Sequence, residues 1–125
     1  MTAHPTPQQL GALGEELAEQ HLVGMGYQIL ARNWRWQKGE LDLVADQSGE
    51  IVFVEVKARR SQRYGPPEES ITRLKRERLI QTAYAYLSST DREDASWRID
   101  VVAMDMERDG TATRLEHIVS AIEGG

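Results

Sequence analysis

GELDLVADQSGEIVFVEVK (residues 39–57) contains two mainly apolar segments separated by the polar residues 46–49. The first segment spans residues 40–45, and the second begins at residue 50 and ends at residue 58. Both segments are short and mainly apolar, and the second is rich in Val, which is typical of β-strands that contribute to a core. Polar residues ending in Gly indicate the turn of a β-hairpin. The pattern predicts one shared apolar face, formed by Leu41, Leu43, Ala45, Val52, Val54 and Val56.

Three charged residues interrupt this apolar hairpin: Asp42 on the first strand, and Glu55 and Lys57 on the second. Residues two apart on a strand share a face about 7 Å apart, and burying charge among valines is costly. A two-residue turn at 48–49 places Asp42 opposite Glu55, with Cβ atoms about 5 Å apart. The same register places Glu40 opposite Lys57.

Two carboxylates this close repel each other by about 3 kcal/mol at an effective dielectric near 20. A hard cation such as Mg²⁺ or Mn²⁺ turns this repulsion into binding, and it can activate a water for attack on a phosphodiester. Lys57 would then orient that water or stabilise the transition state. The alternative is structural: Glu55 and Lys57 decorate a solvated face, and Glu40 forms a plain ion pair with Lys57.

The chain of 125 residues suits one domain over residues 1–125. It has no cysteine, and its three histidines lack ligand-like spacing, so we expect oxygen ligands for any metal. The absence of an apolar run of about 20 residues argues against a membrane span, and we expect a cytoplasmic protein without a signal peptide. The net charge is −5, but residues 57–78 carry eight Lys or Arg against three acids, which favours a phosphate-binding face there.

The remaining elements follow from caps and periodicity. We expect a first helix from Thr6-Pro7 to Gly24, a strand over 27–36, a second helix over 72–88 and a strand over 97–106. Residues 113–119 are ambiguous and could form an edge strand. The predicted α-β-β-β-α-β order indicates an α/β fold with a mixed central sheet flanked by helices. We expect residues 61–72 to form a mobile loop and the C-terminal tail to fray.

Helical spacing also predicts which side chains face the core. The first helix presents a stripe of Leu10, Leu13, Gly14, Leu17, Ala18, His21 and Met25. The second presents Leu74, Ile80, Ala83, Tyr84 and Leu87.

The hairpin resembles the restriction-endonuclease-like superfamily, whose signature is an Asp followed on the next strand by Asp/Glu-x-Lys. The chain is most similar to the bacterial YraN-type family, itself similar to archaeal Holliday-junction resolvases. The segments that carry this resemblance are LGEELA (13–18), GYQILARNW (26–34), GELDLVA (39–45), VFVEVKAR (52–59), Lys75-Arg76 and RIDVVA (98–103).

The resemblance implies a restriction-endonuclease-like core, a Mg²⁺ or Mn²⁺ cofactor, DNA as partner and a homodimer like that of the resolvases. It adds Glu15 from the first helix as a third ligand beside Asp42 and Glu55, although Glu15 could equally be a solvated flank residue. Asp100 matches the family but has lower priority. Leu41 stands where the superfamily often has Pro, a departure common among resolvase-like members.

Basic and aromatic residues surround the hairpin in sequence. Two tryptophans, Trp34 and Trp36, interleave with cations and could stack on bases or lie in the core under Arg stems. A basic start to the second helix opposes the helix dipole, which leaves phosphate contact or a solvated face as its reason. Our candidates for nucleic-acid contact are Arg32, Arg35, Lys38, Arg59, Arg60, Arg73, Lys75 and Arg76.

The leading hypothesis is a metal-dependent endonuclease-like protein that hydrolyses DNA, with branched and single-stranded forms as candidate substrates. Asp42, Glu55 and Glu15 would bind the metal, and Lys57 would complete the catalytic set. Two alternatives stay open: a nucleic-acid-binding module with little or no catalysis, and a scaffold for a protein partner.

Overall fold

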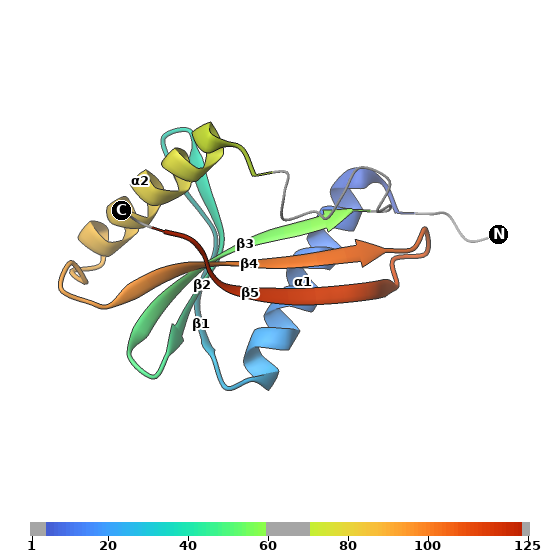
Figure 1. Cartoon of the computed structure of the whole chain (residues 1–125), viewed down its shortest axis with the longest axis horizontal. Helices are drawn as coiled ribbons and strands as arrows, with labels where there is room; N and C mark the ends of the chain where they lie inside the picture. Colours follow the sequence, from blue (N-terminus) through green and yellow to red (C-terminus); the bar gives the residue numbers. More distant parts are fainter. Residues whose placement is uncertain (1–4, 60–70, 124–125) are drawn as a thin grey trace.

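Two helices cover opposite faces of one mixed sheet (Figure 1). The computed structural model describes residues 5–59 and 71–123, and its strands lie in the order β1-β2-β3-β4-β5. β3 and β4 are parallel, and the other neighbours are antiparallel. The elements are α1 (Pro7–Gly24), β1 (Gln28–Trp36), β2 (Gly39–Gln47), β3 (Glu50–Arg59), α2 (Arg73–Ser89), β4 (Trp97–Met106) and β5 (Ala112–Ile122).

This architecture confirms the predicted α/β class and is consistent with a restriction-endonuclease-like core. The ambiguous segment forms β5, an edge strand that pairs with β4. The predicted mobile loop lies almost entirely outside the described residues, as do Arg60 and the last two residues of the tail.

The helix ends follow from local hydrogen bonding. The Thr6 side chain accepts from the Gln9 backbone N–H and Gln9 reciprocates, with Pro7 as the first helical residue. Thr72 caps α2 by accepting from the Lys75 backbone N–H at 3.2 Å. Neither helix of the described chain is both long and apolar enough to cross a bilayer.

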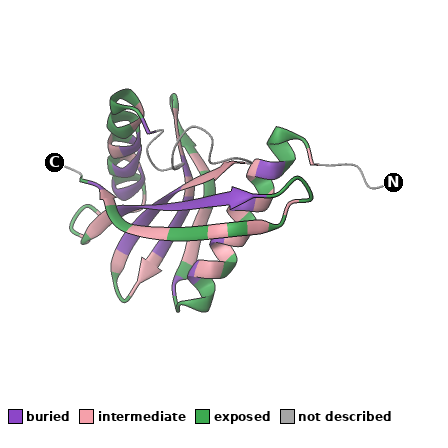
Figure 2. Ribbon diagram, turned by 45° about the vertical axis from the view of Figure 1, so that its right-hand side comes forward, coloured by how far each residue is buried: buried purple, intermediate pink, exposed green. Residues whose placement is uncertain are grey.

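Alternation along β3 sends Val52 and Val54 under α1 and Ile51 and Phe53 under α2. Figure 2 shows buried residues where the sheet meets the helices. The predicted face of β2 needs one correction: Leu43 and Ala45 lie under α1 as expected, but Leu41 packs on the α2 side. Val44 lies on that side too. The alternation of β2 therefore shifts between Leu41 and Leu43, at Asp42.

Three predicted core residues are wrong. Met25 (56% exposed) follows the last turn of α1, Leu74 (55%) stands in the first turn of α2, and Tyr84 (50%) packs edge-on against Trp97 while half of it faces solvent. The side chains and glycine that α1 buries are Leu10, Gly14, Ala18 and Leu22. Those that α2 buries are Leu79, Thr82, Ala83, Tyr86 and Leu87.

Gly14 allows α1 to lie close to β3, and this contact gives a matched pair of substitutions. A Cβ at Gly14 would stand 2.7 Å from the Ala58 Cβ, whereas one at Gly11 meets nothing within 4 Å. We expect Gly14→Ala to lower the free energy of unfolding by about 1–3 kcal/mol because α1 must lift from the sheet. Gly11→Ala should raise it by about 0.5–1 kcal/mol through helix propensity. Urea denaturation measures both, and equal stability of the two variants would contradict the close packing of Gly14.

Candidate functional site

The pairing of β2 with β3 ends before it reaches Asp42 and Glu55. The Cα partners of the two strands run from Gln47–Glu50 to Leu43–Val54, the register predicted from a two-residue turn. Both strands continue beyond this last pair within the described residues. Asp42 is therefore not paired with Glu55 through the backbone. Its Oδ2 instead accepts a hydrogen bond from the Val56 N–H at 2.8 Å, which holds the carboxylate at the opening.

Three carboxylates from two elements converge on one side of this opening. Glu15 of α1 and Glu40 and Asp42 of β2 each offer one oxygen, and these oxygens all lie within 4.8 Å of one another. The structure thus brings together Glu15 and Asp42, as predicted. Glu40 was missed as a member, although its position two residues before Asp42 on a strand was a visible signal.

Glu40 also differs from its predicted pairing. The alternative placed it against Lys57, but its Oε2 pairs with Arg35 Nε at 2.7 Å. Its Oε1 accepts a hydrogen bond of 3.3 Å from Asn33 Nδ2, which also donates to Glu15 Oε1 at 2.9 Å. Glu40 therefore forms its cross-strand ion pair with Arg35 of β1 rather than with Lys57, and Asn33 connects it to Glu15.

Glu55 stands on the other side of the opening and is 4% exposed. Lys75 of α2 reaches it, with Nζ 3.0 Å from Glu55 Oε2. Burial lowers the pKa of Lys75, but the Glu55 carboxylate outweighs that effect, so the pKa is raised. Lys75, predicted as a nucleic-acid contact, is thus also a partner of the buried acid.

The opening has strongly perturbed electrostatics. The pKa of Asp42 rises to about 9, because the group is buried and because Glu55 shares a hydrogen bond and repels its charge. The Val56 N–H opposes this rise. Burial and the nearby Lys75 ammonium lower the pKa of Lys57, against the attraction of Glu55 and Asp42. Such shifts of closely spaced groups are common at functional sites.

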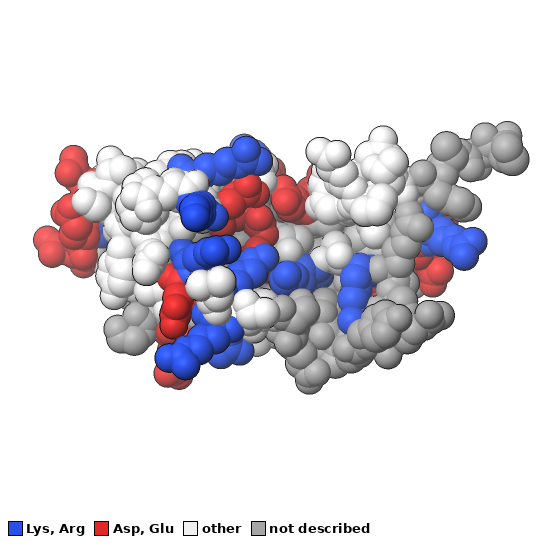
Figure 3. Space-filling view, turned by 90° about the horizontal axis from the view of Figure 1, so that it is seen from above, with Lys and Arg blue, Asp and Glu red and all other residues white. Residues whose placement is uncertain are grey.

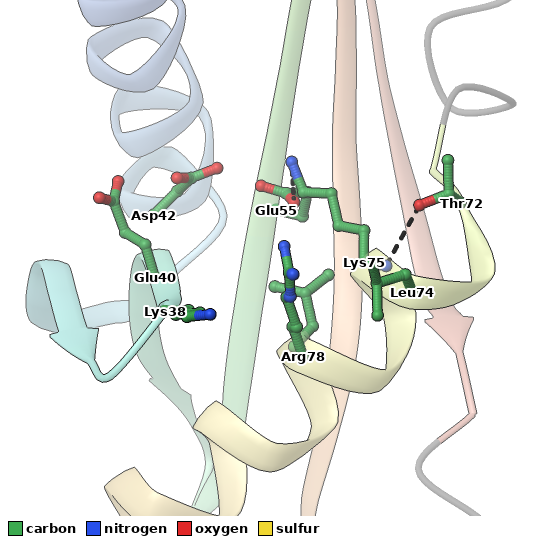
Figure 4. Close-up of a pocket in the computed structure, with 10 residues that line it drawn as sticks. Lys38, Glu40, Asp42, Glu55, Thr72, Leu74, Lys75 and Arg78 are labelled. Atoms are coloured by element: carbon green, nitrogen blue, oxygen red, sulfur yellow. Dashed lines mark hydrogen bonds and ion pairs between the residues drawn. The ribbon is translucent and has the colours of Figure 1, made fainter.

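A pocket of about 480 Å³ lies between the start of β2 and the first turns of α2 (Figure 4). Acidic groups on β2 and β3 face three basic side chains: Lys38, Lys75 and Arg78. Arg78 belongs to the basic start of the second helix, for which phosphate contact was one predicted reason, although it was not among the individual candidate contacts. The other lining residues are Gly39, Glu40, Asp42, Glu55, Thr72, Leu74 and Leu79.

A second hollow of about 390 Å³ lies on the other side of the acidic cluster. It includes Glu15, Glu19, Arg32 and Asn33 among its lining residues. Figure 3 shows Lys and Arg side chains surrounding a group of acidic ones on the upper face of the molecule. The carboxylates therefore border two hollows, the first with a basic wall and the second lined by three acids and Arg32.

Several predicted nucleic-acid contacts have acidic partners within the chain. Arg32 Nη2 donates to Glu19 at 2.7 Å, which lowers the pKa of Glu19, and Arg59 lies 3.6 Å from the buried Asp105. Arg73 pairs with Glu77 in an exposed contact. Arg76 is exposed. Cations already paired offer less to a phosphate, so Lys38, Arg76 and Arg78 are the stronger candidates.

The two tryptophans have different surroundings. Trp34 packs edge-on against Tyr86, with ring centroids 5.3 Å apart, and joins the core on the α2 side. Trp36 is 39% exposed and is the one available for contact with a ligand.

Asp100 belongs to a separate buried network. It is fully buried, lies 2.8 Å from His117 Nε2, and accepts hydrogen bonds from Arg98 and the Ser120 N–H. The His21 ring packs edge-on against His117 with centroids 5.4 Å apart. These contacts assign Asp100 a role in joining β4 to β5.

Comparison with known proteins gives a consistent family match. A family model described as "Uncharacterised protein family UPF0102" matches residues 14–104. A UPF0102 protein of Pelobacter propionicus is 44% identical over 98% of this chain and 88% of its own length. Similar proteins from Roseiflexus castenholzii and Syntrophomonas wolfei are 44% and 48% identical, over 92% and 90% of this chain and 94% and 96% of their own lengths. The names of these relatives state no activity.

Proposed function

The chain belongs to the uncharacterised protein family UPF0102, and we propose that it is a Mg²⁺- or Mn²⁺-dependent nuclease that hydrolyses phosphodiester bonds of DNA. The observation that carries the proposal is the opening between β2 and β3. There Glu15, Glu40 and Asp42 converge beside the buried Glu55 and a pocket with a basic wall.

The donor set suits a hard divalent cation. All the candidate ligands are carboxylate oxygens, which Mg²⁺ and Mn²⁺ prefer over softer donors. In the metal-free protein, Asp42 retains a proton at neutral pH because no cation compensates its burial. Asp42, Glu15 and Glu40 would hold the ion, with Glu55 across the opening. When bound, the ion supplies an activated water and neutralises charge on the scissile phosphate.

The chain's own side chains would orient the substrate. Lys57 extends from β3 beside Glu55, where its ammonium can hold the attacking water or stabilise negative charge on the phosphate. Lys38 and Arg78 line the pocket and would bind phosphates of the same strand. Exposed Trp36 would stack on an unpaired base, which favours branched or single-stranded DNA as substrate.

One observation supports a second candidate function, a nucleic-acid-binding module without catalysis. The Lys75 ammonium lies 3.0 Å from Glu55 and neutralises its negative charge. Glu55 therefore needs no metal ion to balance its charge. In that case DNA binding would be sensitive to salt but independent of Mn²⁺.

The test is cleavage of nicked, branched and single-stranded DNA by purified protein with and without Mg²⁺ or Mn²⁺. We expect metal-dependent cleavage that falls at least about 10-fold in Glu15→Gln, because a ligand is lost. Glu16→Gln, at the exposed neighbouring position of α1, should cleave like the parent. Salt-sensitive binding without turnover would favour the second candidate. Equal cleavage by Glu15→Gln and the parent would refute the metal site.

A further inference from the structure

Asn33 adopts a backbone conformation that strands rarely contain. Its φ is 47°, in the left-handed region, although it lies in the middle of β1. Non-glycine residues occur there only in a few per cent of cases, and Asn is among those that tolerate it. The pairs Arg32–Leu43 and Trp34–Leu41 flank it, so Asn33 stands across from Asp42. The irregularity of β1 therefore falls beside the acidic opening.

The Asn33 side chain joins two of the converging acids. Nδ2 donates to Glu15 Oε1 at 2.9 Å and to Glu40 Oε1 at 3.3 Å. Glu15 belongs to α1 and Glu40 to β2, so this single amide connects the helix layer to the sheet. An amide between two carboxylates must present its NH₂ group, because its oxygen would be repelled by both.

We propose that Asn33 is a positioning residue that holds Glu15 and Glu40 together for a divalent cation. This inference rests on the proposed function. Two acids of like charge drift apart unless donors hold them, and ligands are commonly oriented by such outer hydrogen bonds. The Asn33 amide is neutral, so it organises the carboxylates without adding a positive charge to a cluster in which the exposed Arg35 already pairs with Glu40. A Lys or Arg at this position would compete with the cation.

The competing explanation is that Asn33 serves only the backbone. Asn suits positive φ, so the residue could be present for the kink of β1 alone. Glycine separates the two explanations, because it adopts positive φ without strain but has no amide.

The experiment compares Asn33→Gly with Ser48→Gly in titrations of Mn²⁺ followed by calorimetry and by the melting temperature. Ser48 also has positive φ (53°) but lies in the β2–β3 turn, outside the site. We expect Asn33→Gly to weaken Mn²⁺ binding about 10-fold while its metal-free melting temperature stays within a few degrees of the parent. Ser48→Gly should bind Mn²⁺ like the parent. DNA cleavage by Asn33→Gly should recover at saturating Mn²⁺, which a merely structural defect would not allow.

A second variant guards against misfolding of the first. Asn33→Asp keeps the shape but replaces the donor with another acid. Because the side chain at position 33 faces Glu15 and Glu40, we expect the metal-free melting temperature of Asn33→Asp to lie below that of the parent. We expect Mn²⁺ to raise the melting temperature of this variant by more than it raises that of the parent. Parent-like Mn²⁺ binding by both variants overturns the positioning role and leaves the proposed function standing. Absence of Mn²⁺ binding by the parent itself overturns both.

Discussion

Asp42→Asn is expected to abolish Mn²⁺ binding and DNA cleavage and, at the same time, to stabilise the metal-free protein. The substitution removes one of the two carboxylates, Glu40 being the other, that belong to both the acidic cluster and the pocket. An amide oxygen can still accept from the Val56 N–H, so the local backbone contact survives. Loss of function accompanied by a gain in stability is typical of sites whose charges are arranged for a ligand.

The stability effect has a defined pH dependence. The pKa of Asp42 is about 9 in the folded protein against an ordinary value of 3.8. Between these values the unfolded chain has released a proton that the folded chain retains, so parent stability falls as pH rises. The Asn side chain of the Asp42→Asn variant does not titrate, so the variant lacks this pH dependence. The advantage of Asp42→Asn should therefore grow from about pH 4 towards pH 9.

We expect a gain on the order of 1–2 kcal/mol at pH 7, because the folded parent must keep a buried Asp42 protonated at a pH where the unfolded chain has released that proton. In a domain of this size each kcal/mol corresponds to about 3–6 °C in the melting temperature. Mn²⁺ should raise the melting temperature of the parent, increasingly at higher pH because binding displaces the Asp42 proton. It should leave Asp42→Asn unchanged.

The matched control is Asp94→Asn, which alters an exposed Asp in the turn before β4. It should change neither stability nor the response to Mn²⁺. Scanning calorimetry with and without Mn²⁺ from pH 5 to 9 measures all of these quantities. A metal-free Asp42→Asn protein that is less stable than the parent across this range would contradict the assigned burial and repulsion.

Asp100→Ala should give the largest loss of stability, about 3–5 kcal/mol, because it leaves buried charge without a partner. Asp100 is fully buried and receives hydrogen bonds from Arg98 and from the Ser120 N–H, with His117 at 2.8 Å. The Ser120 contact lies where the pairing of β4 with β5 shifts register. Its removal should loosen β5 in particular.

The pH dependence of this contribution has the opposite sign to that of Asp42. Burial would raise the pKa of Asp100, but the hydrogen bonds of His117, Arg98 and Ser120 prevail and lower it below 3.8. The stabilisation that the ionised Asp100 gives the folded protein is thus complete above about pH 4, and it is lost as the pH falls through the lowered pKa. The difference in unfolding free energy between the parent and Asp100→Ala should shrink in strong acid.

Glu50→Gln provides the control on the same network. Glu50 also pairs with Arg98 but is partly exposed, so its loss should cost less than about 1 kcal/mol. Urea denaturation at several pH values measures both variants, and hydrogen exchange localises the loosening to β5. Equal losses for Asp100→Ala and Glu50→Gln would contradict the dominance of the buried acid.

Local interactions account for what could be predicted from the sequence. Thr6 with Pro7 and Thr72 begin the helices, because a cap depends on residues within three positions. The two-residue turn at 48–49 fixed the register of the paired part of β2 and β3. The alternation of side chains along β3 then placed Glu55 on the opposite face of the strand from Val54 and Val56, which pack under α1. The approach of Glu15 to Asp42 was predicted through the resemblance, and the structure brings them together.

The sequence alone determined which residue types this protein has for binding a cation, and most of the elements that carry them. Only the tertiary structure decided which of them meet. The separation of β2 from β3 at Asp42, the reach of Lys75 to Glu55 and the junction of Glu15 with Glu40 through Asn33 all join residues distant in the chain. Capping and periodicity act within a few residues, whereas these contacts depend on how two helices pack against opposite faces of a twisted sheet.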